Sequence, residues 1–274
     1  IFYTLRCCRY FLLTILLRMI MNSVTSMDRE YNFSSQQKPL SFIKIILWTV
    51  ALLFLAQIVL GFLVGLIYGI VNAKDYSEQS FEQFISYTPY MLIFSMASSL
   101  LTIPLLKRAT YKSTWKECFE FWAIKPIVKK ELMQWLVISL SLWIIITVLA
   151  RLIEFPIEQF MLDIKDSTQG SWAVLIVFLV ICIVAPIIEE LIFRGWLFGQ
   201  LELTRLGNIG AITVSTFVFT VIHYQYEQLA TFFFVFVVGL FLAIIRSKTK
   251  NLGYCIFAHM FFNTLAMIEL YLFV

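Results

Sequence analysis

Residues 171–200 read SWAVLIVFLVICIVAPIIEELIFRGWLFGQ, an apolar run interrupted by one proline and by the charged side chains of Glu189, Glu190 and Arg194. A helix of roughly 20 apolar residues crosses the hydrocarbon core of a bilayer. Ionisable groups inside a membrane are costly, so they usually face a protein interior or a water-filled cavity and mark functional sites. This stretch therefore predicts a transmembrane helix that carries part of a polar site.

The composition extends this interpretation to the whole chain. Hydrophobic residues make up 61% of the 274 residues and charged residues only 14%, whereas soluble domains contain about 25% charged residues. This length accommodates about seven helices of roughly 20 apolar residues each. We therefore predict an all-α fold, a polytopic membrane helix bundle, with spans near residues 43–71, 85–106, 132–153, 171–200, 209–225, 228–245 and 252–273.

The predicted bundle forms one transmembrane domain over residues 41–274, which leaves no stretch long and polar enough for a separate soluble domain. Residues 1–40 are predicted to be an N-terminal extension. Its apolar core, Phe11–Leu17, is too short to span a bilayer and resembles a signal-peptide core or an interfacial segment. We expect that translation starts at Met21 or Met27 and that the residues before the start are not native.

The basic residues set the expected orientation. Seven Lys and Arg residues lie in the connection 107–131, and the connections beyond its two flanking spans are acidic. Because cytoplasmic loops carry an excess of Lys and Arg, this connection and the amino end are expected in the cytoplasm, and the carboxyl end outside. Topology thus explains the net charge of +4. We expect a bacterial plasma-membrane protein that contacts lipid and binds no nucleic acid.

Two carboxylates and an arginine form the first polar motif. Glu190 and Arg194 are four residues apart, so they share a helix face and can form an ion pair. Glu189 points about 100° away, so it can face a cavity. Pro186 has no N–H and clashes with the carbonyl of Cys182, so we expect a kink or an opening just before the carboxylates. The alternative is a helix end whose charges meet lipid headgroups.

The chain contains only two histidines, and both lie in apolar stretches. Phe219 and His223 share one helix face and His259 and Asn263 share another, because each pair is four residues apart. A lone buried His or Asn is more often part of an interhelical hydrogen bond than of a catalytic site. However, antiparallel helices on either side of a turn would bring Glu189 and His223 to the same depth, where the other two groups can meet them.

The order of these motifs resembles a known family. E-E-x-x-x-R at 189–194, F-x-x-x-H at 219–223 and H-x-x-x-N at 259–263 follow one another on successive predicted membrane helices. This arrangement resembles the CAAX-protease and bacteriocin-processing (CPBP, or Abi) intramembrane proteases, over about residues 170–268. The resemblance implies an endopeptidase that hydrolyses a peptide bond in a peptide or membrane-protein substrate. We expect peptide maturation or bacteriocin immunity rather than CAAX processing.

The resemblance also implies roles for four residues. Glu189, with His223, polarises the attacking water, and His259 with Asn263 holds the oxyanion of the tetrahedral intermediate. The physical chemistry agrees with these roles, because a carboxylate in a low-dielectric cavity binds a proton more readily and suits a general base. A neutral amide is a suitable donor to an oxyanion.

Glu190 and Arg194 are expected to support the shape of the site. A metal remains an open alternative, since His223 and His259 with a glutamate can bind zinc and the family is often described as metalloproteases. However, the chain has no H-E-x-x-H motif, and its five cysteines lack metal-binding spacing. We favour a metal-free mechanism that Glu189 drives.

A non-enzymatic membrane protein is the alternative function. A bacteriocin-immunity factor or a transporter could use the same polar cluster for packing or for proton relay. The intact motifs favour the enzyme. A transporter would usually show paired broken segments in two related halves, and this sequence shows no such repeat.

Overall fold

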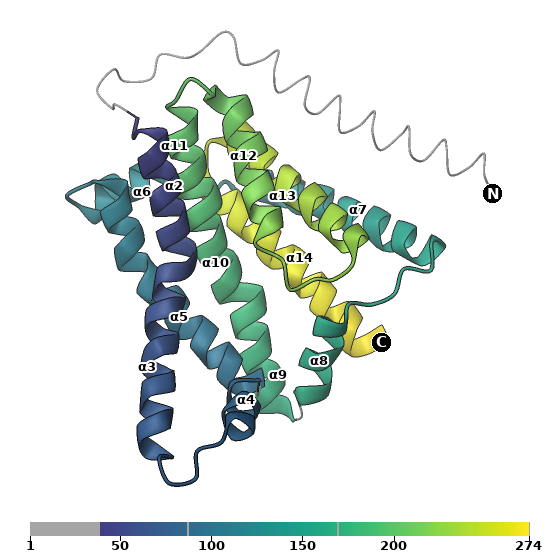
Figure 1. Ribbon diagram of the computed structural model, residues 1–274. Helices are drawn as coiled ribbons and strands as arrows, with labels where there is room; N and C mark the ends of the chain where they lie inside the picture. Colours follow the sequence, from purple (N-terminus) through teal and green to yellow (C-terminus); the bar gives the residue numbers. More distant parts are fainter. Residues whose placement is uncertain (1–38, 87, 169, 274) are drawn as a thin grey trace.

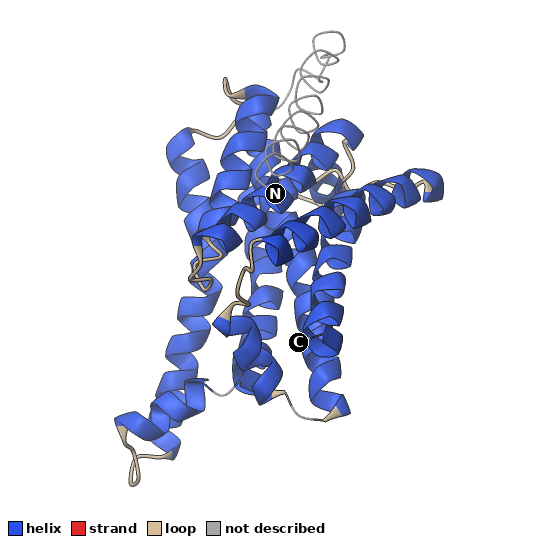
Figure 2. Cartoon of the chain, turned by 90° about the vertical axis from the view of Figure 1, so that its right-hand side faces the viewer, coloured by secondary structure: helices blue, strands red, loops and turns tan. Residues whose placement is uncertain are grey.

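The computed structural model describes residues 39–86, 88–168 and 170–273 (Figure 1). Within these ranges all regular structure is helical, as Figure 2 shows from the side, so the predicted all-α bundle is confirmed. The predicted start sites and nearly all of the predicted N-terminal extension lie outside the described residues. The helices, with three π-helical segments named η, are α2 (Phe42–Val50), η1 (Ala51–Leu55), α3 (Ala56–Val71), α4 (Glu78–Ser86), α5 (Thr88–Thr110), α6 (Trp115–Phe121), α7 (Lys129–Leu152), α8 (Gln159–Ser167), α9 (Ser171–Phe178), η2 (Leu179–Val184), α10 (Ala185–Glu190), η3 (Leu191–Leu197), α11 (Phe198–Glu202), α12 (Gly207–Val221), α13 (Leu229–Thr249) and α14 (Leu252–Phe273).

Six helices of the described chain are long and apolar enough to cross a membrane, namely Phe42–Val71, Tyr90–Thr110, Lys129–Leu152, Trp172–Glu202, Leu229–Thr249 and Leu252–Phe273. The seventh predicted span, 209–225, corresponds to α12, which has only 15 residues. At about 1.5 Å per residue this helix is shorter than the hydrocarbon core. The short helices α4, α6 and α8, which lie in the connections, were not predicted from the sequence.

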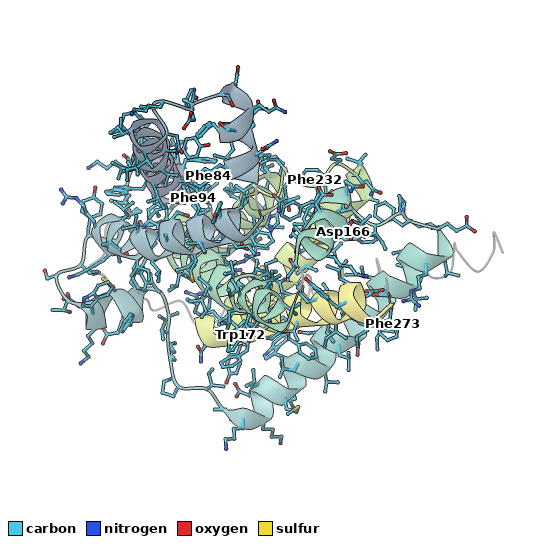
Figure 3. All side chains as sticks on the ribbon, turned by 90° about the horizontal axis from the view of Figure 1, so that it is seen from below. Phe84, Phe94, Asp166, Trp172, Phe232 and Phe273 are labelled. Atoms are coloured by element: carbon cyan, nitrogen blue, oxygen red, sulfur yellow. The ribbon has the colours of Figure 1, made fainter. Side chains whose placement is uncertain are left out.

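The outer surface of the bundle is apolar. Figure 3 looks at the molecule from the end that carries Trp172 and Phe273, whose side chains are 80% and 72% exposed. Large apolar side chains on a surface indicate contact with a membrane or a partner. Together with the six candidate spans, this surface indicates an integral membrane protein.

The glutamate helix runs without a break from α9 to α11, but its hydrogen-bond ladder changes twice. The π-helical segment η2 ends directly before Pro186, and the Ala185 N–H donates to the carbonyl of Val180, five residues back. By the same register Pro186 would donate to Ile181, but it has no N–H, so this carbonyl is free to accept from another group. The predicted disturbance before the carboxylates is therefore confirmed as a π-helical segment.

Three predicted cytoplasmic connections meet at one end of the bundle. The Lys250 ammonium contacts the Glu202 carboxylate at 2.7 Å, which joins the turn after α13 to the end of α11. The Leu252 N–H donates to the Ala123 carbonyl at 2.8 Å, so the connection 107–131 packs against the same turn. The three connections therefore lie at the same end of the bundle, as expected if all of them face the same side of the membrane.

Candidate active site

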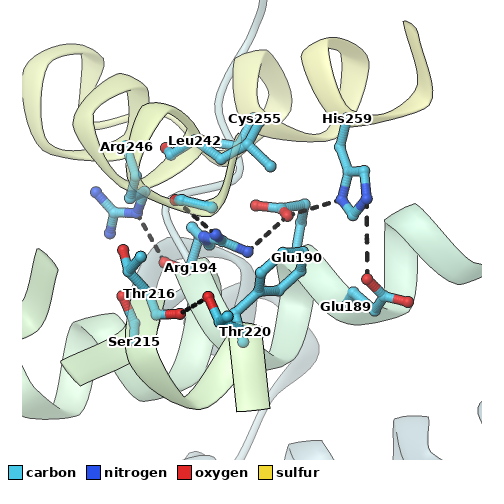
Figure 4. Close-up of polar contacts among 12 residues, drawn as sticks. Glu189, Glu190, Arg194, Ser215, Thr216, Thr220, Leu242, Arg246, Cys255 and His259 are labelled. Atoms are coloured by element: carbon cyan, nitrogen blue, oxygen red, sulfur yellow. Dashed lines mark hydrogen bonds and ion pairs between the residues drawn. The ribbon is translucent and has the colours of Figure 1, made fainter. Parts of the chain in front are cut away.

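A fully buried ion pair lies at the centre of the site, as predicted from the spacing of its residues. Glu190 Oε1 and Arg194 Nη1 are 2.9 Å apart, and both side chains are 0% exposed. Figure 4 shows the guanidinium reaching α13, where Nη2 donates to the Gly239 carbonyl at 2.8 Å. The guanidinium also lies 4.3 Å from the ring centroid of Phe219 on α12. The pair therefore joins three helices, because a buried charge needs several partners.

His259 on α14 connects the two glutamates (Figure 4). Its Nδ1 is 2.9 Å from Glu190 Oε1, and its Nε2 is 3.8 Å from Glu189 Oε2. A carboxylate paired with arginine can only accept, so Nδ1 of His259 carries a proton. Glu190 thereby fixes the imidazole orientation and directs Nε2 toward Glu189.

His223 approaches Glu189 from another side. Its Nε2 lies 4.0 Å from Glu189 Oε2, and its Nδ1 lies 2.6 Å from the Phe219 carbonyl. Because a carbonyl only accepts, Nδ1 is the protonated nitrogen and Nε2 is free to accept a proton. Burial lowers the pKa of His223 below its ordinary value, while the nearby Glu189 acts in the opposite direction. Because its pKa is lowered, we expect the His223 imidazole to be neutral at pH 7.

His223 is not on a membrane helix, contrary to the prediction. The helix α12 ends at Val221, and His223 lies in the connection to α13. Glu158 holds this connection, because its two carboxylate oxygens accept from the backbone N–H groups of Glu227 and Gln228 at 3.2 Å each. Carboxylates favour a helix N-terminus, so Glu158 also caps α13. Nothing in the sequence separates Glu158 from the other acidic loop residues.

A cavity of about 310 Å³ opens beside these groups. Glu189 and His223 line one side of it, and the side chain of Glu189 is 26% exposed. This is the outcome expected from the helix period, with one carboxylate neutralised by arginine and the other facing a cavity. The remaining lining includes apolar side chains of α10 and η3, such as Ile188 and Ile192.

Asn263 makes a different contact from the one expected. Its Nδ2 donates to the Ile181 carbonyl at 2.8 Å, which is the acceptor that Pro186 leaves without a helical donor. The structure thus brings Glu189, His223 and His259 together, while Asn263 binds the backbone of the glutamate helix. The amide nitrogen has a second N–H that remains available.

The amino-terminal wall of the cavity was not predicted from the sequence. Beside the apolar Leu52, Leu53 and Phe54, it contains polar side chains of α3 and α5, namely Gln57, Ser95, Ser98, Ser99 and Thr102. The α5 residues follow an i, i+3, i+4, i+7 spacing, which is the signature of one helix face. This polar stripe in an otherwise apolar span could have been recognised in the sequence from its spacing.

The metal alternative concerns Glu189, His223 and His259. Two imidazole nitrogens and a carboxylate are ligands that suit zinc. However, the described part of the chain contains no group of three or more His, Cys, Asp or Glu side chains placed to hold a metal ion. We therefore derive no step that passes through a metal.

Comparison with known proteins identifies the region that carries the site. Residues 171–265 match the family model "Type II CAAX prenyl endopeptidase Rce1-like". The chain is 31% identical over 120 residues to the Bacillus subtilis (strain 168) protein named "Putative membrane peptidase YdiL", covering 41% of this chain and 47% of the relative. It is 27% identical over 137 residues to an Escherichia coli "Uncharacterized 24.3 kDa protein", covering 49% of this chain and 62% of the relative.

The chain spans about half the length of these curated relatives, and no solved structure matches it significantly. The matched region contains Glu189, Glu190, Arg194, His223, His259 and Asn263, the six residues singled out from the sequence. The match over residues 171–265 agrees with the resemblance to CPBP proteases, and this region is similar to the Rce1-like endopeptidases.

Proposed function

We propose that this protein is an intramembrane endopeptidase that hydrolyses a peptide bond with water activated by Glu189 and His223. One observation carries the proposal: Glu189 Oε2 lies 3.8 Å and 4.0 Å from the Nε2 atoms of His259 and His223. These distances are longer than a direct hydrogen bond, so a bridging water fits between the groups. The family model that matches this region supports the reaction class.

The first step is addition of water to the scissile carbonyl. Glu189 accepts one proton of the water as general base, while Nε2 of neutral His223 accepts a hydrogen bond from the other. The resulting hydroxide adds to the carbonyl carbon and forms a tetrahedral oxyanion.

The second step is collapse of this intermediate. His259 and the second N–H of Asn263 donate to the oxyanion. For this role Nε2 of His259 must also carry a proton, while Nδ1 keeps its 2.9 Å contact with the Glu190 carboxylate. The proton held by Glu189 passes to the amide nitrogen as the C–N bond breaks, which releases an amine and a carboxylic acid.

The test is the variant Glu189→Gln, assayed with a panel of internally quenched peptides in lipid vesicles. Glutamine keeps the shape of the side chain but cannot take a proton, so we expect activity to fall by at least about 10²-fold. Glu269→Gln, a carboxylate on α14 outside the site, is the matched control and should retain activity. Cleavage by Glu189→Gln at the parent rate would refute this mechanism.

The proposed setting is the bacterial plasma membrane, with the amino end and the connection 107–131 in the cytoplasm. Lipid surrounds the bundle, and the substrate is a peptide or a membrane protein. Single cysteines introduced at Lys112 and Lys116 should react with a membrane-impermeant reagent only after the membrane is opened. Labelling of these cysteines in intact cells would show that the connection 107–131 lies outside, which is the opposite orientation. A purified protein without any peptidase activity would favour the immunity factor or transporter.

A further inference from the structure

The cavity is lined by two parts of the chain that lie far apart in the sequence. Glu189 and His223 lie on the side that belongs to the family region. The rest of the lining comes from the amino-terminal helices, which contribute Gln57 of α3 and the α5 stripe Ser95, Ser98, Ser99 and Thr102, together with Leu52, Leu53 and Phe54. A substrate that fills the cavity beside Glu189 therefore contacts these polar side chains.

Gln57 has no structural explanation elsewhere in the fold. It is the only Asn or Gln between Phe42 and Val71, in the middle of an apolar span. Polar side chains within membrane helices usually bond to a neighbouring helix, but the carboxamide of Gln57 has no hydrogen bond to any residue that the structure describes. It presents donors and an acceptor to the cavity.

The hydroxyls of α5 complement the carboxamide. Ser98 Oγ donates to the Ser95 carbonyl at 2.9 Å, and Thr102 Oγ1 donates to the Ser98 carbonyl at 3.0 Å. Each hydroxyl has one donor and two acceptor lone pairs. These two have used their protons within the helix, so their oxygens are left to accept from a ligand in the cavity.

We propose that Gln57 and this hydroxyl wall bind the main chain of the peptide substrate in an extended conformation, opposite Glu189. The proposal rests on the proposed peptidase function. A peptide must leave the helical form to expose its carbonyl carbon, and its N–H and C=O groups then need partners in a low-dielectric cavity. The wall supplies acceptors for N–H groups, and Gln57 supplies donors for a carbonyl. A hydrocarbon tail would use none of these groups.

The binding test uses the Glu189→Gln protein in nanodiscs, so that the probe is not consumed. The probe is a fluorescent, benzophenone-bearing peptide of alternating Ala and Leu with terminal lysines, and its crosslinking is measured against concentration. We expect Gln57→Leu to raise the half-saturating concentration roughly tenfold, as the loss of one hydrogen bond implies. A probe N-methylated at its central amides should bind about tenfold more weakly to protein that retains Gln57.

The matched control moves the carboxamide to the neighbouring face at almost the same depth. Ile58 is 66% exposed on the same helix and does not line the cavity. The double variant Gln57→Leu with Ile58→Gln keeps the composition of the span, and it should bind as weakly as Gln57→Leu alone. Recovery of binding in the double variant would overturn the proposal, because the wall would then have no directional role.

The cleavage arm separates this proposal from the peptidase function. In protein that retains Glu189, Gln57→Leu should raise KM for the peptide roughly tenfold and leave kcat within about threefold, because the interaction is made in the ground state and the transition state alike. If Gln57→Leu leaves cleavage unchanged, the proposed substrate binding by Gln57 is wrong, while the peptidase function stands. If crosslinking depends on Gln57 but protein that retains Glu189 cleaves no peptide, the peptide-binding role of Gln57 stands and the peptidase function is wrong. If no variant crosslinks the probe, the proposed peptide binding by Gln57 and the hydroxyl wall is wrong.

Discussion

The carboxyl-terminal helix α13 and the amino-terminal span Phe42–Val71 are almost equally apolar but lie in different surroundings. In the most apolar window of each helix, 44% of the residues are buried in α13 and 11% in Phe42–Val71. The buried helix accepts a guanidinium hydrogen bond at Gly239, whereas the exposed span contributes one carboxamide, Gln57, to the cavity. Buried charges therefore gather where protein surrounds them, because only protein groups can replace their hydration.

The largest expected effect comes from breaking the buried pair. Glu190→Ala or Arg194→Ala leaves an unpaired charge in the protein interior, so we expect a loss of about 3–5 kcal/mol of stability together with activity. The matched control is Arg151→Ala, whose ion pair with Glu269 has side chains 67% and 28% exposed. This variant should lose about 0–1 kcal/mol. Equal losses in denaturant unfolding would show that burial does not distinguish the two pairs.

Asn263 comes next, because it has two candidate roles. Asn263→Ala should lower turnover by about 10²–10³-fold if the amide is an oxyanion donor. It also leaves the Ile181 carbonyl without its donor, which costs about 1–3 kcal/mol. Adding Pro186→Ala returns a backbone N–H near that carbonyl, so stability should recover while turnover stays low. Recovery of turnover in the double variant would make Asn263 a structural residue only.

The close approach of α13 to α12 predicts a smaller effect. A Cβ on Gly239 would lie 2.9 Å from Phe219 Cδ1 and 3.4 Å from Arg194 Nη2. Gly239→Ala should therefore cost about 1–3 kcal/mol through overpacking. Gly69→Ala in the exposed span is the control, since a Cβ at this position would meet no neighbouring atom within 4 Å. That change should be neutral or stabilise by about 0.5–1 kcal/mol. The measurement is thermal unfolding in detergent, with the parent protein alongside.

The smallest expected effect is that of chelation. A mechanism driven by Glu189 needs no metal, so peptidase activity should survive prolonged treatment with a strong chelator. Loss of activity that returns only when zinc is added back, with near-stoichiometric metal in the active protein, would overturn the metal-free mechanism. Either outcome keeps Glu189 as the group that deprotonates water.

Much of the site could be predicted because its residues interact within one helix. The ion pair of Glu190 and Arg194 follows from a four-residue separation, and the opposite direction of Glu189 follows from the helix period. Pro186 predicted the change of hydrogen bonding before the carboxylates, since a missing N–H is a property of the residue itself. Composition alone indicated the membrane bundle.

The rest depends on how the helices pack. No periodicity indicates that His259 donates to Glu190 or that Asn263 meets the carbonyl of Ile181, because each contact joins residues on different helices. The wall that Gln57 shares with α5 likewise exists only once α3 and α5 lie beside the glutamate helix. The sequence by itself determined the membrane class, the six long apolar helices and the polar motifs. Only the tertiary structure decided which polar groups meet, since distances between helices depend on the packing of all their side chains.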